Sequence, residues 1–481
     1  MQMKIVLCAC GFLFWWATLA DLGVSVSSAS LGTEALHGSV QTNGLIRLGT
    51  ETEAERQARM AWWTHDRFGM FIHFGLYSLA ARHEWVKSLE QMDNAAYEKY
   101  FNLFDPDRLD VKAWVRQAKQ AGMKYVVLTT KHHEGFCLFD SKLTDYKITN
   151  TKYGKDLVRE FADACRQEGL RVGFYYSLPD WHHNDFPVDR YHPQRPVKCG
   201  PWDPEGKQGS DDPWNEINRN RSMARYRKYL YGQITEILTN YGKVDLLWLD
   251  FTMTGVRTKH PEDWQAEKLL ALIRRLQPRI IVNDRLGLGL TTVDGWDFVT
   301  PEQRIPEPGE MFRFGNPVAW EACQTFSGSW GYHRDESSWK TSKECIGLLI
   351  RAVSGGGNLI MNVGPTGRGN FDRRAEERLS DYARWMKDHS RSVYGCTAAP
   401  PGFDAPDGTV LTYNPECRRL YLHLLGNSAS QRLKIGFAEK VFYAQFLNDA
   451  SELLIRGGAL LLPEALPDVE VPVVELYLRW N

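Results

Sequence analysis

Residues 245–251 read Asp-Leu-Leu-Trp-Leu-Asp-Phe and contain the first candidate for chemistry. A short apolar run of strand-forming residues that ends in a carboxylate predicts a buried parallel strand with Asp250 at its carboxyl end. Barrel enzymes carry their catalytic groups at this end of the strands. Trp248 lies two residues earlier, so its ring should share the face of Asp250 and could form a wall of a sugar-sized pocket. The alternative is a structural Asp that caps the next helix.

Histidines stand near the ends of two further predicted strands. His73 lies near the end of the strand 68–74, and Gly75 after it permits close approach of a ligand. His132 and His133 follow the β-branched strand 124–130. Adjacent side chains on an extended backbone point apart, and no H-E-x-x-H helix accompanies them. Hydrogen bonding to sugar hydroxyls is therefore favoured over zinc binding.

Other predicted strands also end in polar residues. Tyr175 lies in the strand 171–177, and Arg285 follows the strand 280–284. Glu302 closes the run Trp-Asp-Phe-Val-Thr-Pro-Glu, which we expect to begin as a short strand, and Glu321 follows Trp320. Two carboxylates that flank a glycosidic bond, one as nucleophile and one as general acid/base, are the requirement for retaining glycoside hydrolysis. The combined strand ends therefore favour a glycosidase.

Six motifs, in their order along residues 62–367, closely resemble the α-L-fucosidases of glycoside hydrolase family 29. They are Phe-Gly-Met-Phe-Ile-His-Phe-Gly, Lys-His-His-Glu-Gly-Phe, Tyr-Tyr-Ser, Leu-Trp-Leu-Asp, Asn-Asp-Arg and Asn-Leu-Ile-Met-Asn-Val-Gly-Pro. The resemblance implies a retaining exo-glycosidase that hydrolyses terminal α-L-fucosyl linkages of fucosylated glycans through a covalent fucosyl-enzyme intermediate. The Thr-Pro-Glu-Gln run and the Pro-rich loop after it are similar to the subgroup that acts on α-1,3/1,4-fucosyl branches, with the aryl-fucoside-active subgroup as the alternative.

The resemblance also implies roles for individual residues. Asp250 matches the family's nucleophile, and Glu302 is similar in its setting to the acid/base of several members. Glu321 is the rival for that role, and its alternative is a structural carboxylate below the pocket. The fucose contacts of the family map onto His73, Trp85, His132, His133, Tyr175, Trp248 and Arg285. We expect Arg285 and the imidazoles to favour ionised Asp250, and Glu302 to need a drier or more anionic setting that raises its pKa.

Helical patterns alternate with strands over more than three hundred residues, beginning with the helix 110–121 before the strand 124–130. Further helices are expected at 157–168, 222–241, 261–276, 342–354 and 372–389. This alternation predicts an α/β fold, a TIM-like (β/α) barrel that need not be regular. The aromatic-rich segment 178–221 is expected to shape the substrate entrance.

Three regions are predicted along the chain. Residues 1–29 have the layout of a secretory signal with cleavage after Ala20 or Ala29, and an uncleaved membrane anchor is the alternative. Residues 30–392 should form the catalytic barrel. Short alternating runs in residues 393–481 predict a small antiparallel β-sandwich. The signal implies a secreted, periplasmic or lysosome-like location, with no membrane attachment after cleavage.

Composition limits the partners. The chain has 481 residues and a net charge of −1 with a pI near 6.9, so no general field attracts nucleic acid or an anionic membrane. No ligand set with metal spacing is present, so neither a metal ion nor a cofactor is expected. Seven cysteines follow the signal, and we expect mostly buried thiols with one or two disulfides at most.

A different class of function competes with the enzyme. A carbohydrate-binding protein could keep the pocket without the chemistry, as a catalytically inactive fucose-binding protein on the same fold. The presence of both candidate carboxylates argues against it. A barrel glycosidase of another specificity, such as a galactosidase, is a further alternative. The oligomeric state is not predicted.

Overall fold

The structure is a computed structural model that describes residues 51–196, 213–288, 296–307, 309–313, 316–426 and 431–479. The predicted signal segment, Cys199 and part of the long entrance segment lie outside these residues. Within the described residues, no helix is both long enough and apolar enough to span a membrane.

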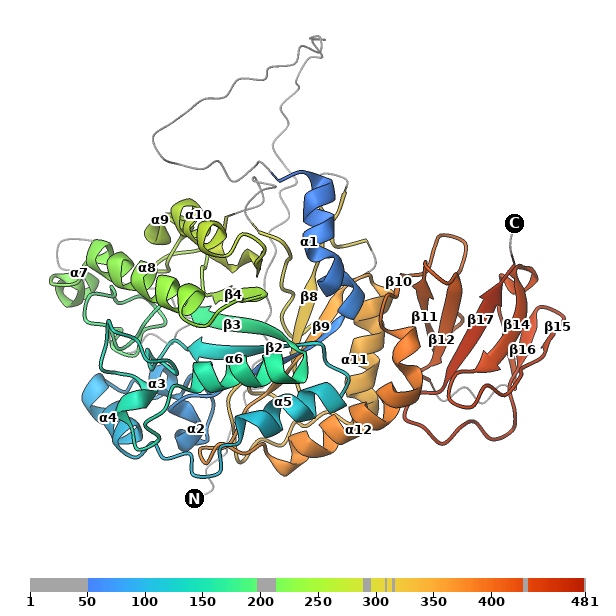
Figure 1. The fold of residues 1–481 in the computed structure, drawn as a ribbon, viewed down its shortest axis with the longest axis horizontal. Coiled ribbons are helices and arrows are strands. Elements are labelled where there is room, and N and C mark those ends of the chain that lie inside the picture. Colours follow the sequence, from blue (N-terminus) through green and yellow to red (C-terminus); the bar gives the residue numbers. More distant parts are fainter. Residues whose placement is uncertain are drawn as a thin grey trace, which may run out of the picture. The chain divides into compact units, whose positions relative to one another are not determined.

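A curled parallel sheet of seven strands organises residues 51–392 (Figure 1). Its order is β5 (Ile281–Val282), β4 (Leu246–Asp250), β3 (Arg171–Ser177), β2 (Tyr125–Lys131), β1 (Phe68–Ile72), β9 (Asn358–Val363) and β8 (Glu321–Thr325). Almost every strand residue is buried, as expected when helices cover one face and the barrel interior the other. Since all pairs are parallel, all carboxyl ends meet at one rim.

The gap between β5 and β8 is closed by an irregular segment. Phe298 bridges Asn283 beside β5, and on the other side Val299 bridges Trp320 and Glu302 bridges Cys323 of β8. The predicted short strand at 296–300 is therefore wrong as a regular strand, because it makes only isolated bridges. Pro301 has no N–H to donate to a ladder, which limits regular pairing here. The predicted irregular barrel is confirmed, and this segment, residues 296–302, forms its irregular seam.

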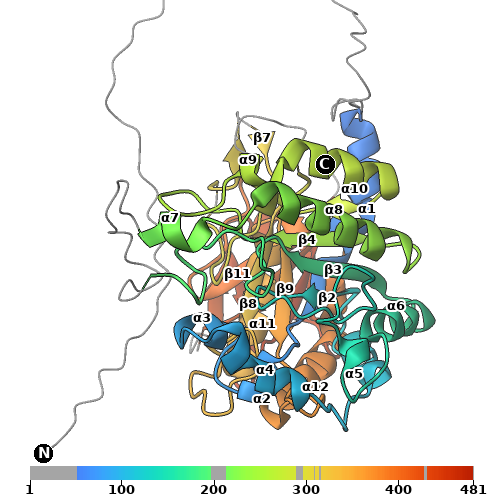
Figure 2. The same cartoon turned by 90° about the vertical axis from the view of Figure 1, so that its left-hand side faces the viewer.

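Helices cover the outside of the sheet (Figures 1 and 2). The long ones are α1 (Glu53–Asp66), α5 (Val111–Gln120), α6 (Leu157–Glu168), α8 (Met223–Thr239), α10 (Ala266–Leu276), α11 (Ser342–Ser354) and α12 (Arg373–His389). Short ones are α2 (Tyr77–Ala80), α3 (Val86–Leu89), α4 (Asn94–Asn102), α7 (Pro213–Asn218) and α9 (Pro261–Trp264). The single helix predicted at 261–276 is wrong, because Gln265 has φ 51° and separates α9 from α10.

Antiparallel strands follow α12, as predicted. One sheet has the order β10 (Thr397–Ala398), β11 (Thr409–Asn414), β12 (Arg419–Leu424), β17 (Val473–Leu478), β14 (Val441–Phe446). A second has the order β13 (Arg432–Lys434), β16 (Ala459–Leu461), β15 (Ile455–Arg456). Their apolar residues share a core that includes Leu420, Leu460 and Leu476. The remaining hairpin, β6 (Phe312–Arg313) with β7 (Asn316–Pro317), precedes β8.

The described cysteines are free thiols. Cys137, Cys165, Cys323, Cys345 and Cys396 are buried, and Cys417 is exposed. The expectation of buried thiols holds for five of these six residues, and no disulfide joins any of the six.

Candidate active site

Asp250 is the last residue of β4 and lies at the rim of strand ends. Its Oδ2 accepts a hydrogen bond from the Tyr175 hydroxyl at 2.8 Å. Its Oδ1 lies 3.3 Å from Nη1 of Arg285, and His133 Nε2 is 3.8 Å from Oδ2. The Asp250 side chain is 15% exposed. Tyr175 and Arg285 thus hold the carboxylate from two sides, and part of it remains open to a ligand.

Glu302 lies on the other side of the same guanidinium. Arg285 Nη2 is 2.9 Å from Glu302 Oε2, and the Glu302 side chain is 24% exposed. Arg285 Nε donates to the Thr300 hydroxyl at 2.8 Å, which fixes the plane of the guanidinium. One Arg therefore bridges Asp250 of β4 and Glu302 of the irregular seam.

The pKa of Asp250 is raised to about 6. Burial is the main cause, and the nearby Glu302 carboxylate adds to it, while Arg285 and the Tyr175 hydroxyl act in the opposite direction. Our expectation that the neighbouring groups would favour the ionised acid is therefore correct for Arg285 but is outweighed by desolvation. The imidazoles contribute no positive charge, because burial also lowers the pKa of each.

His73 follows β1, and its ring is neutral. Burial lowers the pKa of His73 to about 4. The Asn362 amide donates through Nδ2 to the Trp330 carbonyl at 2.6 Å, so its Oδ1 accepts from His73 Nδ1 at 2.6 Å. This network assigns the proton to Nδ1 and leaves Nε2 as an acceptor for a ligand hydroxyl.

His133 is oriented in the same way. The Ser177 hydroxyl donates to the Pro179 carbonyl at 2.7 Å, so the Ser177 oxygen accepts from His133 Nδ1 at 2.7 Å. Burial holds the pKa of His133 well below its usual range, so the ring presents a lone pair at Nε2 beside Asp250. The His132 ring is 4.1 Å from it, and His132 Nδ1 is a buried atom without a hydrogen-bond partner among the described residues.

Aromatic rings surround these groups. Trp85 lies 5.6 Å from the His133 ring, and Trp330 lies 5.2 Å from the His73 ring. Trp248 stacks on Tyr175 at 6.4 Å and lies beneath the guanidinium of Arg285 at 5.2 Å. Rings of this kind suit the C–H faces of a sugar.

Glu321 lies inside the barrel and not at the rim. It is fully buried, its Oε1 accepts from Trp248 Nε1 at 3.1 Å, and its Oε2 accepts from the Tyr125 hydroxyl. Burial raises the pKa of Glu321 to about 7. Glu321 opens β8, whereas Glu302 bridges Cys323 two residues further along, nearer the carboxyl end.

Several residues near the site were not predicted. Glu84 is buried next to Trp85, and its Oε2 accepts from the backbone N–H groups of Trp330 and Gly331 at 3.2 and 2.9 Å. Asn362 orients His73, and Phe251 packs on His133 at 4.7 Å. Asn362 and Phe251 lie inside or beside a quoted motif and Glu84 precedes the predicted contact Trp85, but only tertiary contacts distinguish these residues from their neighbours.

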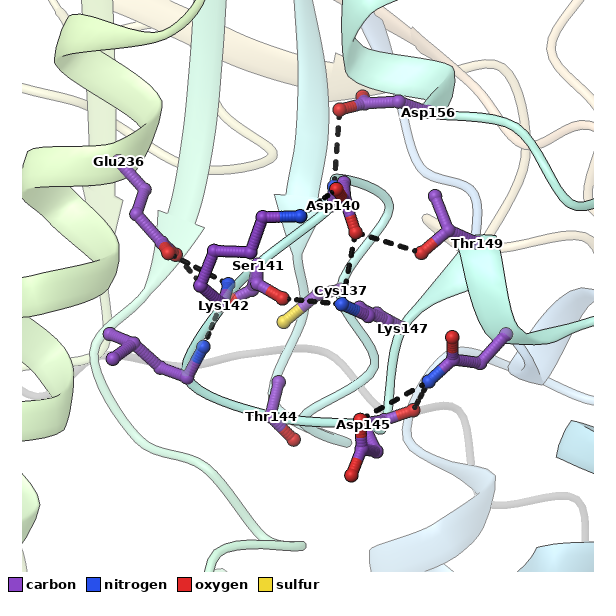
Figure 3. A network of polar contacts seen from close by, with 12 residues as sticks. Cys137, Asp140, Ser141, Lys142, Thr144, Asp145, Lys147, Thr149, Asp156 and Glu236 are labelled. Carbon is purple, nitrogen blue, oxygen red and sulfur yellow. Dashed lines mark hydrogen bonds and ion pairs between the residues drawn. The ribbon is translucent and has the colours of Figure 1, made fainter.

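The loop that follows the His pair is fixed by a polar network (Figure 3). Glu236 of α8 accepts from the Ser141 hydroxyl at 2.7 Å and from the Lys142 N–H at 2.8 Å. The Asp140 carboxylate pairs with Lys147 at 2.9 Å, and Asp156 at the start of α6 accepts from the Asp140 N–H at 3.1 Å. The loop after β2 is therefore anchored to both flanking helices.

In the part of the chain that the structure describes, no group of three or more His, Cys, Asp or Glu side chains could hold a metal ion. The chemistry available at the rim is that of two carboxylates, neutral imidazoles, a phenol and one guanidinium.

Comparison with known proteins agrees with this geometry. The family profile described as Alpha-L-fucosidase matches residues 41–391. The chain belongs to the α-L-fucosidase family. It is therefore an enzyme, a glycoside hydrolase that acts on α-L-fucosyl linkages. The human plasma α-L-fucosidase is 30% identical over 358 residues, which are 69% of each chain.

Solved structures of α-L-fucosidases share the fold. Isoenzyme 1 from Paenibacillus thiaminolyticus has a TM-score of 0.79 and 42% identity, over 88% of this chain and 100% of that one. A family 29 enzyme from Bacteroides thetaiotaomicron was trapped as a covalent intermediate with 2-fluoro-fucosyl fluoride. Its structure has a TM-score of 0.74 and 26% identity, over 88% of this chain and 96% of that one. Covalent trapping is a property of retaining hydrolysis, which uses a nucleophile of the enzyme.

Proposed function

We propose that Asp250 is the nucleophile and Glu302 the acid/base of a two-step retaining hydrolysis of terminal α-L-fucosides. The observation that carries this assignment is the bridge through Arg285, which contacts Asp250 at 3.3 Å and Glu302 at 2.9 Å. Two carboxylates on one guanidinium are compatible with the ~5–5.5 Å separation of retaining pairs.

In the first step Asp250 attacks the anomeric carbon while Glu302 protonates the leaving oxygen. The Asp250–C1 bond forms as the glycosidic bond breaks, and the aglycone leaves with the proton from Glu302. Asp250 must be ionised for this step. Its pKa of about 6 therefore predicts that kcat/KM rises with pH up to and through this value.

In the second step Glu302 removes a proton from water, and the hydroxide attacks C1 from the face that the aglycone left. The bond from C1 to Asp250 breaks, and fucose is released with retained configuration. Arg285 contacts both acids, at 3.3 Å from Asp250 and 2.9 Å from Glu302, so it can balance their charges in both steps.

The remaining predicted contacts support binding of the sugar ring. His73 and His133 each present a neutral Nε2 as a hydrogen-bond acceptor, which suits hydroxyl groups of a neutral sugar. We assign Trp85, His132, Tyr175 and Trp248 to the same fucose site. Glu321 is assigned a structural role, because it is fully buried beneath Trp248.

Rescue by azide tests the two glutamates. Loss of the acid/base should leave partial activity on an aryl fucoside with a good leaving group, and azide should restore turnover with an azide of retained configuration. We expect this for Glu302→Ala. Glu321→Ala should show no azide rescue, and Asp250→Gly should lose nearly all turnover without retaining-type rescue. Rescue of Glu321→Ala with a dead Glu302→Ala would reverse the assignment.

We also propose a preference for α-1,3/1,4-fucosyl branches, which rests on the Thr-Pro-Glu-Gln run and the following Pro-rich loop. Release of fucose from branched oligosaccharides should be faster than from α-1,2-linked ones. Rapid cleavage of an aryl fucoside without any preference for branched glycans would contradict this proposal.

The substrate partner is a fucosylated glycan, and we propose that the protein meets it after export through residues 1–29. The plasma α-L-fucosidases among its relatives support an extracellular setting. The near-neutral charge supports an uncharged glycan and argues against nucleic acid or a membrane surface as partners.

A further inference from the structure

The residue directly after Asp250 has a left-handed backbone. Phe251 has φ 84°, a conformation that side chains other than glycine rarely adopt. Such strain persists only where surrounding contacts impose it, and it is concentrated at functional sites. Gln303, directly after Glu302, also has a positive φ of 54°. A strained residue thus follows each of the two rim carboxylates.

Contacts on both sides impose the turn at Phe251. The Leu178 N–H donates to the Asp250 carbonyl at 3.1 Å, and Trp264 Nε1 donates to the Thr252 hydroxyl at 2.9 Å. The chain before and after Phe251 is therefore fixed.

The turn directs the Phe251 ring into an aromatic cluster at the rim. Its centroid lies 4.7 Å from His133, 4.8 Å from Tyr191 and 5.4 Å from Trp85. Only 9% of Phe251 is exposed. The Phe251 ring thus packs on His133, whose Nε2 faces the Asp250 carboxylate at 3.8 Å.

We propose that Phe251 is a positioning residue for the first chemical step: its ring holds the His133 imidazole against Asp250 and excludes water from this pair. The proposal rests on the role of Asp250 as nucleophile. The left-handed backbone is the conformational cost of placing a ring from the adjacent residue at this point, where glycine would adopt the turn without strain.

Exclusion of water from Asp250 should change how kcat/KM depends on pH. The titratable and charged groups that face Asp250 are Arg285, Glu302, Tyr175 and His133, and burial is the main cause of its pKa of about 6. Removal of the Phe251 ring would hydrate the carboxylate and lower its pKa. The acid limb of kcat/KM should therefore move to lower pH, which a change in folding stability alone would not produce.

Phe251→Gly tests the proposal, because glycine keeps the turn and removes only the ring. The readout is the rate of inactivation by 2-fluoro-fucosyl fluoride, which reports formation of the covalent intermediate. We expect a fall of roughly tenfold or more and an acid limb lower by about half a pH unit or more. Phe251→Leu, which retains apolar volume, should be affected less and serves if the glycine variant does not fold.

Gln265→Gly is the matched control. Gln265 is exposed and has φ 51°, so this variant relieves the same kind of strain outside the rim. It should keep the wild-type inactivation rate and the wild-type acid limb of kcat/KM. The inference is overturned if a folded Phe251→Gly or Phe251→Leu variant has the wild-type inactivation rate and the wild-type acid limb of kcat/KM. Mass spectrometry of the inactivated wild type separates the two proposals: a label on Asp250 supports its role whatever Phe251 does, and a label elsewhere refutes both.

Discussion

Burial raises the pKa of two carboxyl groups inside the barrel, Asp250 and Glu321. Desolvation raises the pKa of Asp250 to about 6 and that of Glu321 to about 7. Asp250 has Arg285 nearby as a counter-charge, whereas Glu321 accepts hydrogen bonds from neutral groups that include Trp248 Nε1 and the Tyr125 hydroxyl. A buried carboxyl group without a cation is best accommodated in its neutral form. The two acids therefore differ in environment, and this difference supports different roles.

At the residue scale we predict that Glu321 makes stability depend on pH. The folded protein keeps the Glu321 proton up to a pKa of about 7, whereas the unfolded chain loses it near the ordinary glutamate pKa of 4.5. Between these values the folded state binds more protons, so the free energy of unfolding falls as pH rises, by about 3 kcal/mol in total. This contribution is present at low pH and is lost through pH 7.

Glu321→Gln replaces the titratable carboxyl group with an amide of similar shape, so this side chain no longer couples stability to pH. Urea unfolding at pH 5 and pH 8 should show a smaller loss of stability at pH 8 for this variant than for the wild type. The comparison isolates Glu321 from the other buried acids, which both proteins retain. An identical pH dependence in the two proteins would show that Glu321 is not protonated when folded.

At the element scale, side-chain contacts help to attach the irregular seam to the rest of the barrel, where regular strands rely on ladders of backbone hydrogen bonds. Asp297 is 2% exposed and accepts from the Val282 N–H at 2.8 Å through Oδ2. Its two oxygens also contact Arg59 of α1 and Arg274 of α10, each at 2.7 Å. Burial opposes ionisation of Asp297, but these two cations lower its pKa overall. One carboxylate thus joins two helices to β5.

We predict that Asp297→Asn lowers the free energy of unfolding by about 3 kcal/mol, because it leaves two cations without their buried partner. Denaturant unfolding at neutral pH measures the change. The matched control is Asp335→Asn, which breaks an exposed pair with Arg334 whose side chains are 66% and 70% exposed. That variant should change stability by less than about 1 kcal/mol. Equal effects of the two variants would contradict the role of the seam contact.

At the scale of the whole molecule, α12 connects the barrel to the C-terminal strands. Trp385 of α12 is buried, donates through Nε1 to the Val471 carbonyl at 2.8 Å and stacks on His389 at 5.0 Å. Val471 and Val473 belong to the same apolar core as the barrel residues. The buried Arg67 also donates to the Cys396 carbonyl at 2.8 Å. The C-terminal strands therefore complete the core of the barrel region.

Trp385→Ala should destabilise the protein by about 3–5 kcal/mol and lower the midpoint of thermal unfolding, because the change opens a cavity in a shared core. Phe442→Ala is the control, since Phe442 lies on β14 and is 52% exposed, and it should have little effect. Calorimetry of both variants measures the change. A Trp385→Ala protein that melts like the wild type would mean that the C-terminal strands contribute nothing to the barrel.

The sequence alone was sufficient to predict the barrel, the antiparallel C-terminal strands and the candidate site residues at the strand ends. Apolar strand runs between helical patterns leave few arrangements, and parallel strands bring all carboxyl ends to one rim, so Asp250, His73 and Tyr175 could be expected together. The seam and the break at Gln265 could not be predicted, because both depend on backbone conformations that tertiary contacts impose.

The resemblance favoured Glu302 over Glu321 as the acid/base, but the environment of each glutamate comes only from the tertiary structure. Pairing across the seam leaves Glu302 beside Arg285 at the rim and Glu321 beneath Trp248. Desolvation, the cause of the raised pKa of Asp250, is likewise a property of everything packed around a group. Neither pairing register nor burial is encoded in a short stretch of chain, so these features required the folded structure.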